Sequence, residues 1–148
     1  MLTETLISLY DRDLEKLKAE IGEYKNEADL WKVSGDIKNS AGNLTLHLIG
    51  NLKHFFGAVL GGTGFVRDRD AEFSTAGVPK ENLLSGIDEA VSVVKETLKK
   101  LTDEDLANIY PIEVFGHPMT TEYFVVHLAT HLTWHLGQVN YHRRLLAS

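Results

Sequence analysis

Apolar residues recur every three or four positions over four long stretches of the chain, and this spacing is typical of amphipathic helices. The pattern predicts helices over residues 2–24, 41–60, 80–101 and about 121–146. Ser40 is the expected N-cap of the second helix, and Pro79 immediately precedes the third. Thr120 or Thr121 caps the fourth. Four helices of this length predict an all-α fold, a four-helix bundle with long inter-helix connections.

Two of these connections carry distinctive residues. Residues 61–79 form a polar loop, in which the alternating charges of the run from Arg67 to Asp70 are typical of a solvated segment. A second interpretation places Arg67 or Arg69 at the mouth of a pocket, where its guanidinium would receive a substrate carboxylate. The centre of the segment before the last helix, residues 112–115, is expected to be a short extended piece.

Length and composition narrow the class of protein. The chain has 148 residues, which favours one domain over residues 1–148. It has no cysteine, so any metal site must use nitrogen and oxygen ligands. Its net charge of −6 disfavours binding to nucleic acid. No apolar stretch reaches the roughly 18–20 residues of a membrane helix, and no targeting segment is visible, so we expect a soluble cytoplasmic protein.

The histidines are the candidate chemical groups. Six of the seven fall in the second and fourth predicted helices. In the fourth, His127, His131 and His135 are spaced four apart and therefore share one face. Two imidazoles so spaced can bind one metal ion, and His47, among apolar neighbours in the second helix, is the candidate third ligand. Three imidazoles suit zinc, nickel, copper or iron. The alternative is that these histidines only form hydrogen bonds at the edge of the core.

Two motifs resemble a known superfamily. The run His131-Leu-Thr-Trp-His135-Leu-Gly-Gln138-Val, followed by basic residues, resembles the last-helix signature H-x-x-x-H-x-G-Q-[IV] of the DinB-like (YfiT-like) superfamily. The segment around His47, from Asn39 to Asn51, resembles the second-helix segment in which that superfamily carries its first histidine. The stretches Gly42–Phe73 and Pro118–Leu145 resemble a DinB-like subfamily whose members are mainly uncharacterised.

The resemblance implies a four-helix bundle with a divalent metal ion, often nickel or zinc, held by three histidines. At the matching positions these are His47, His131 and His135. Members commonly form homodimers. The chemistry known in the wider superfamily is thiol-dependent transfer or isomerisation with low-molecular-weight bacterial thiols.

Other polar residues on the same helices are candidates for supporting roles. His127, one turn before His131, is the best available proton carrier, with a structural role as the alternative. Gln138 and His142 are expected to form hydrogen bonds with the free nitrogens of ligand histidines, and Asn51 either does the same or holds a substrate. The role of His54 stays open.

The leading hypothesis is a metal-dependent enzyme that activates a thiol for attack on an electrophile of unknown identity. Because the chain has no cysteine, this thiol must come from outside the chain. Zinc-protease hydrolysis is disfavoured because Leu132 stands where the catalytic glutamate of H-E-x-x-H would be. The alternative is a non-catalytic, stress-associated dimeric bundle that binds metal.

Overall fold

The computed structural model describes residues 1–148 as a bundle of four long helices. In chain order these are α1 (Leu2–Gly22), α2 (Ala41–Leu52), α4 (Lys80–Lys100) and α6 (Thr121–Leu146). No residue lies in a β-strand, so the predicted all-α class is confirmed, and the bounds lie close to the predicted ones.

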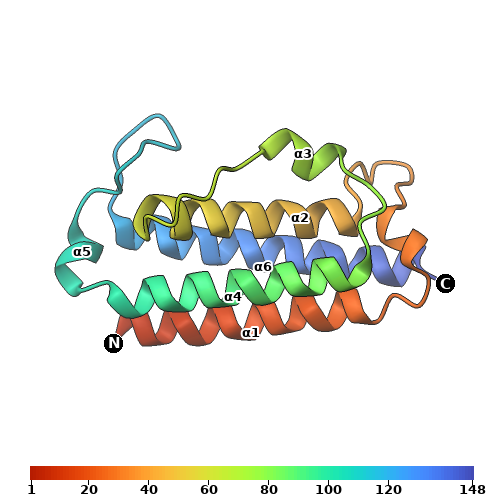
Figure 1. The fold of residues 1–148 in the computed structure, drawn as a ribbon, viewed down its shortest axis with the longest axis horizontal. Helices are drawn as coiled ribbons and strands as arrows, with labels where there is room; N and C mark the ends of the chain where they lie inside the picture. Colours follow the sequence, from red (N-terminus) through yellow and green to blue (C-terminus); the bar gives the residue numbers. More distant parts are fainter.

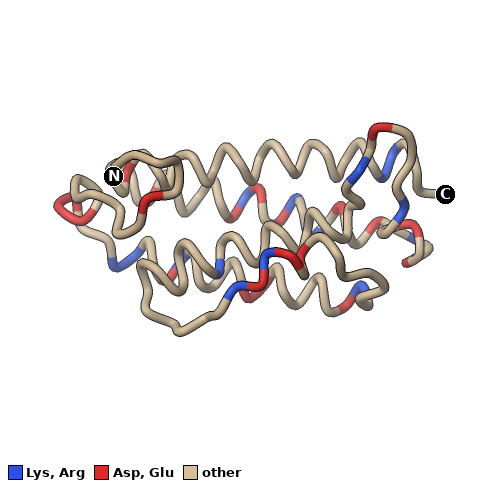
Figure 2. Tube along the Cα trace, turned by 90° about the horizontal axis from the view of Figure 1, so that it is seen from above, with Lys and Arg blue, Asp and Glu red and all other residues tan.

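The four helices enclose one apolar core. α1 packs against α4 and α6, and α2 packs against the same two helices. α1 and α6 run in one direction along the bundle, and α2 and α4 run in the other (Figure 1). Between them lies a core cluster of 27 buried residues. Acidic and basic residues are interspersed along the trace, with neither sign gathered in one continuous stripe (Figure 2).

Side-chain caps set the beginnings of the two helices that matter most for the site. The Ser40 hydroxyl accepts a hydrogen bond from the Asn43 amide at 3.1 Å, and α2 begins directly after it. The Thr120 hydroxyl accepts one from the Tyr123 amide at 3.1 Å, so Thr120 and not Thr121 is the cap of α6.

α2 continues without interruption as a π-helix, η2 (Lys53–Leu60). At its end the Gly61 amide donates to the Phe56 carbonyl, five residues earlier, at 2.9 Å. The prediction of a helix over residues 41–60 is therefore correct. Its second part has the wider π spacing, which the periodicity of apolar residues did not distinguish from α spacing. Such segments are frequent at functional sites.

The connections hold short helices. η1 (Glu27–Trp31) joins α1 to α2, and α5 (Asp103–Ala107) lies between α4 and α6. Residues 61–79, hereafter the crossover segment, return along the whole bundle and contain α3 (Arg69–Ser74), which packs on α2 (Figure 1).

Two predictions about these connections are wrong. The run from Arg67 to Asp70 is not a wholly solvated loop, because the Arg67 side chain is only 12% exposed and pairs with Glu72. Residues 112–115 form bends and irregular backbone instead of an extended piece. The extended pairing nearby is a single bridge between Ile109 and Thr120.

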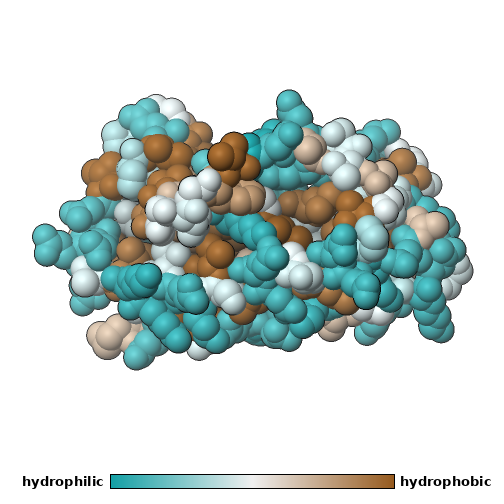
Figure 3. Space-filling model, viewed as in Figure 1, coloured by the Kyte–Doolittle hydropathy of each residue, from teal (hydrophilic) through white to brown (hydrophobic).

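Hydrophilic side chains cover most of the face seen in Figure 1, with hydrophobic side chains exposed in patches between them (Figure 3). None of the helices combines the length and the apolar character that crossing a lipid bilayer requires.

Candidate metal centre

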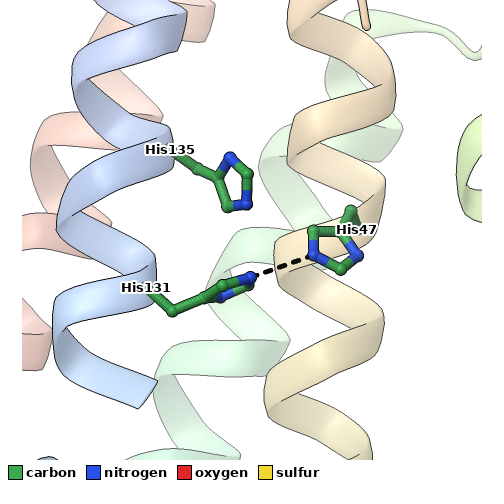
Figure 4. A group of neighbouring side chains, drawn as sticks. All are labelled: His47, His131 and His135. Atoms are coloured by element: carbon green, nitrogen blue, oxygen red, sulfur yellow. Dashed lines mark hydrogen bonds between the residues drawn. The ribbon is translucent and has the colours of Figure 1, made fainter. Parts of the chain in front are cut away.

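Three histidines from two facing helices converge in the structure. His47 projects from α2, and His131 and His135 project from adjacent turns of α6 toward it (Figure 4). One ring nitrogen of each lies within 4.8 Å of those of the other two. The Nε2 atoms of His47 and His131 are 3.1 Å apart. Two nitrogens bound to one tetrahedral zinc ion are about 3.3 Å apart, since each bond is about 2.0–2.1 Å long. The cluster thus has the dimensions of a metal site.

α6 holds its two histidines in place through the apolar residues beside them. Leu128, Leu132 and Leu136 repeat every four residues and are all buried in the core. Because His131 and His135 are offset from this stripe, they lie half-buried at the edge of the core. His47 is more enclosed, with 6% of its surface exposed, and its ring packs against Phe73 from the crossover segment.

The proton of the His47 ring is located by a carboxylate. Nδ1 lies 3.0 Å from Oε1 of Glu72. An ionised carboxylate has no proton to donate, so Nδ1 carries the hydrogen and donates it. The Nη2 atom of Arg67 is also near this nitrogen, but at the longer distance of 3.4 Å. In the neutral ring, Nε2 of His47 then presents its lone pair to the other two histidines.

Glu72 is itself held by Arg67 through two hydrogen bonds. Nε of Arg67 donates to Oε2 at 2.8 Å, and Nη2 donates to Oε1 at 3.0 Å. Burial by itself raises the pKa of the Glu72 carboxyl, but the hydrogen bonds from His47 and Arg67 outweigh it, and the pKa is lowered from the ordinary 4.5. Glu72 is thus ionised at neutral pH although its side chain is only 7% exposed.

The two histidines of α6 differ in their partners. Nδ1 of His135 donates to Oε1 of Gln138 at 2.7 Å, which leaves the lone pair on Nε2. Nδ1 of His131 is buried and has no hydrogen-bond partner. Burial lowers the pKa of His135, and burial with the neighbouring His135 and His47 lowers the pKa of His131 to about 3. Both rings are neutral at pH 7, the state in which imidazole binds a metal ion.

A comparison with known protein families identifies the family of this chain. The model of a family described as "Protein of unknown function (DUF1572)" matches residues 6–148. The chain belongs to the DUF1572 family. Its structure is similar to the crystal structure of a DinB-like protein from Bacillus cereus, with a TM-score of 0.73 and 19% sequence identity, over 95% of this chain and 90% of that one. The DinB-like fold expected from the histidine motifs is therefore confirmed. No curated protein matches the chain.

His142 of this DUF1572 chain does not have the expected supporting role. Its Nδ1 is 2.7 Å from the hydroxyl of Tyr24, and its Nε2 is 2.8 Å from the carbonyl oxygen of Lys32. Both ring nitrogens are thus used where α6 meets α1 and η1, and the prediction that His142 bonds a ligand histidine is wrong. Its position is decided by the buried Tyr24, which spacing along α6 does not reveal.

Asn51 and His127 lie outside the cluster of three ring nitrogens. Asn51 is buried one turn after His47, and its Oδ1 has no hydrogen-bond partner. His127 is half-buried among aromatic rings: it stacks on Phe124 with centroids 6.0 Å apart and meets Phe115 edge-on at 4.8 Å.

Glu72 was not among the residues selected from the sequence of this DUF1572 chain. It lies 25 residues from His47 in a segment without helical periodicity, so no local pattern connects the two. The available signal is Gly50, a glycine inside the predicted second helix, because a glycine there leaves room for another group to approach the helix.

Proposed function

We propose that this DUF1572 protein binds a divalent metal ion, nickel or zinc, through the Nε2 atoms of His47, His131 and His135. The observation that carries the proposal is the convergence of three imidazoles whose ligand nitrogens lie within 4.8 Å of one another. Glu72 and Gln138 hold the Nδ1 protons of His47 and His135, and this turns their Nε2 lone pairs toward the site. Uncharged imidazole nitrogen is a ligand that both metals favour.

The set of three protein ligands is typical of a catalytic rather than a structural site, because one or more metal positions stay available. A bound ion would supply a Lewis acid that lowers the pKa of a thiol or a water molecule. We propose that the protein transfers or isomerises a substrate with the help of a low-molecular-weight thiol. That thiol comes from solution, since the chain has no cysteine. His127, one turn from His131, is the proposed proton carrier.

The alternative is a metal-binding homodimer without catalytic activity. Its dimeric state is supported by large aromatic side chains on the outer face of α6: Trp134 is 70% exposed and Tyr141 is 61% exposed. Exposed apolar area of this kind is available for association with a second copy. An assay of the metal-loaded protein with thiols and a panel of electrophiles separates the two: turnover supports the enzyme, and inactivity across the panel supports the binding protein.

Metal analysis tests the site itself. Protein produced without a histidine tag should contain about one nickel or zinc ion per chain, because three ligands converge at one point. His131→Ala and His135→Ala should each lose this ion on dialysis. His117→Ala, which removes an exposed histidine from the loop before α6, is the matched control and should keep it. Full occupancy in His131→Ala would contradict the ligand assignment.

A further inference from the structure

The crossover segment brings a charged pair to the back of His47. Glu72 and Arg67 lie five residues apart around the beginning of α3, and both face α2. The segment is attached to α2 through Asn43, whose Nδ2 donates to the carbonyl oxygens of Glu72 at 2.9 Å and Thr75 at 2.7 Å. The backbone at Glu72 and three residues after it is therefore tied to the helix that carries His47.

α2 has room for the Glu72 carboxylate because residue 50 is glycine. A Cβ atom built on Gly50 would lie 1.9 Å from Oε2 of Glu72 and 2.7 Å from its Cδ. Neither distance is compatible with van der Waals contact, so any larger residue at this position displaces the carboxylate. Gly50 thus permits the contact between the carboxylate and the Nδ1 atom of His47.

We propose that Glu72, held by Arg67 against Gly50, is a positioning residue that keeps the His47 proton on Nδ1 and directs the Nε2 lone pair toward His131 and His135. The significance of this orientation rests on the proposed metal site. The contact between Glu72 and His47 does not rest on the metal site, because it involves only two side chains of this protein. A histidine without such a partner in water prefers to carry its proton on Nε2, and in that form His47 has no lone pair to offer on this side.

Proton–nitrogen NMR spectra of the histidine rings test the proposal on metal-free protein. In the wild-type protein at neutral pH, His47 should show the Nδ1–H form. Glu72→Ala and Gly50→Ala should both shift His47 toward the Nε2–H form, the first by removing the acceptor and the second by displacing it. Gly22→Ala is the matched control, because nothing lies within 4 Å of a Cβ at this position. It should leave the His47 signals unchanged.

Competition titration with nickel or zinc gives the second measurement. Glu72→Ala and Gly50→Ala should each weaken metal binding about 10–100-fold, the usual effect of losing a partner of a ligand histidine. Alanine is a better helix former than glycine, so Gly50→Ala should retain its helical circular dichroism and report on the site and not on unfolding. Glu72→Gln keeps the shape of the side chain, so it provides the same check against unfolding for the substitutions at Glu72.

The outcomes separate this proposal from the proposed function. An Nε2–H proton on wild-type His47, or an Nδ1–H proton that persists in both Glu72→Ala and Gly50→Ala, would overturn the positioning role whether or not metal binds. If the wild-type protein binds no metal but both variants change the His47 proton, the positioning role stands and the metal site fails. Unchanged metal affinity in both variants would overturn the role of Glu72 toward the metal.

Discussion

Single polar atoms at the contact of α2 with α6 lack the partners that buried groups normally have. Oδ1 of Asn51 and Nδ1 of His131 are both buried without a hydrogen bond. An unpaired buried polar atom costs about 1–3 kcal/mol of stability. In His131 this atom is the one that carries the ring proton when Nε2 binds a metal ion. The unpaired Oδ1 atom makes the polarity of Asn51 unfavourable for folding. Asn51 is therefore a candidate for a role at the site.

Asn51→Leu tests this cost directly. Leucine has nearly the same shape as asparagine and removes the unpaired oxygen, so we expect the free energy of unfolding to rise by about 1 kcal/mol. Chemical denaturation of the metal-free protein measures the change. A clear loss of stability would show instead that the Asn51 amide is well paired in solution.

Among the elements, α1 and α6 are joined by a polar cluster near their C-terminal ends. Glu20 accepts hydrogen bonds from Asn140 at 2.6 Å and from Arg143 at 2.7 Å. Burial by itself raises the pKa of Glu20, but these two partners outweigh it and lower the pKa from its ordinary 4.5. A carboxyl group with a lowered pKa in the folded state stabilises the protein above the ordinary value, and this contribution is lost as the pH falls through the lowered value.

Glu20→Gln should therefore destabilise the protein by about 1–2 kcal/mol at pH 7, because it removes the charge from two short hydrogen bonds. The difference from wild type should shrink as the pH falls below the ordinary 4.5 and through the lowered pKa, where the wild-type carboxyl also becomes protonated. Thermal unfolding over this pH range provides the measurement. Glu15→Gln, at an exposed position of α1, is the control and should have little effect at any pH.

The crossover segment depends on Asn43 for its attachment to α2. Asn43→Ala removes the two hydrogen bonds to the carbonyl oxygens of Glu72 and Thr75, and also the one that its Oδ1 accepts from the Ser40 hydroxyl at the start of α2. Two neutral bonds contribute about 1–2 kcal/mol, so amide hydrogen exchange in residues 66–76 should become roughly tenfold faster. Exchange in the core of α6 should not change. Asn82→Ala, at an exposed position of α4, serves as the control. Equal exchange in both variants would show that other contacts hold the segment.

Helices were the elements that local patterns predicted best. Periodic apolar positions and the caps Ser40 and Thr120 act over a few residues, so the bounds of α2 and α6 follow from neighbouring residues. The π spacing of η2 was missed, because the apolar residues there satisfy either helix type. The partial burial of Arg67 was missed for a different reason: its charge pattern predicts solvation, and the packing of the crossover segment on α2 buries it beside Glu72.

At the scale of the whole molecule, a metal ion bound between α2 and α6 would join two helices far apart in the sequence. An ion that binds only the folded protein adds about 2.7 kcal/mol of stability when its concentration is 100 times its Kd. For a chain of this length that corresponds to an increase in Tm of about 5–10 °C. Differential scanning fluorimetry of the metal-free protein with added nickel or zinc measures the shift.

His135→Ala should show no such increase in Tm, and His117→Ala should show the full wild-type increase. A shift that survives in His135→Ala would mean that the ion binds elsewhere on the protein.

The sequence by itself determined the helices, the Ser40 cap and the shared face of His131 and His135, because a helix places residues four apart on one side whatever surrounds it. The tertiary structure brought His47, the candidate third ligand, within 4.8 Å of these two histidines, and it decided that Glu72 lies behind His47 and that His142 turns away to Tyr24. These contacts join segments 25 to 118 residues apart. They depend on how the whole bundle packs and on where the crossover segment lies across α2, and no pattern within one helix encodes either.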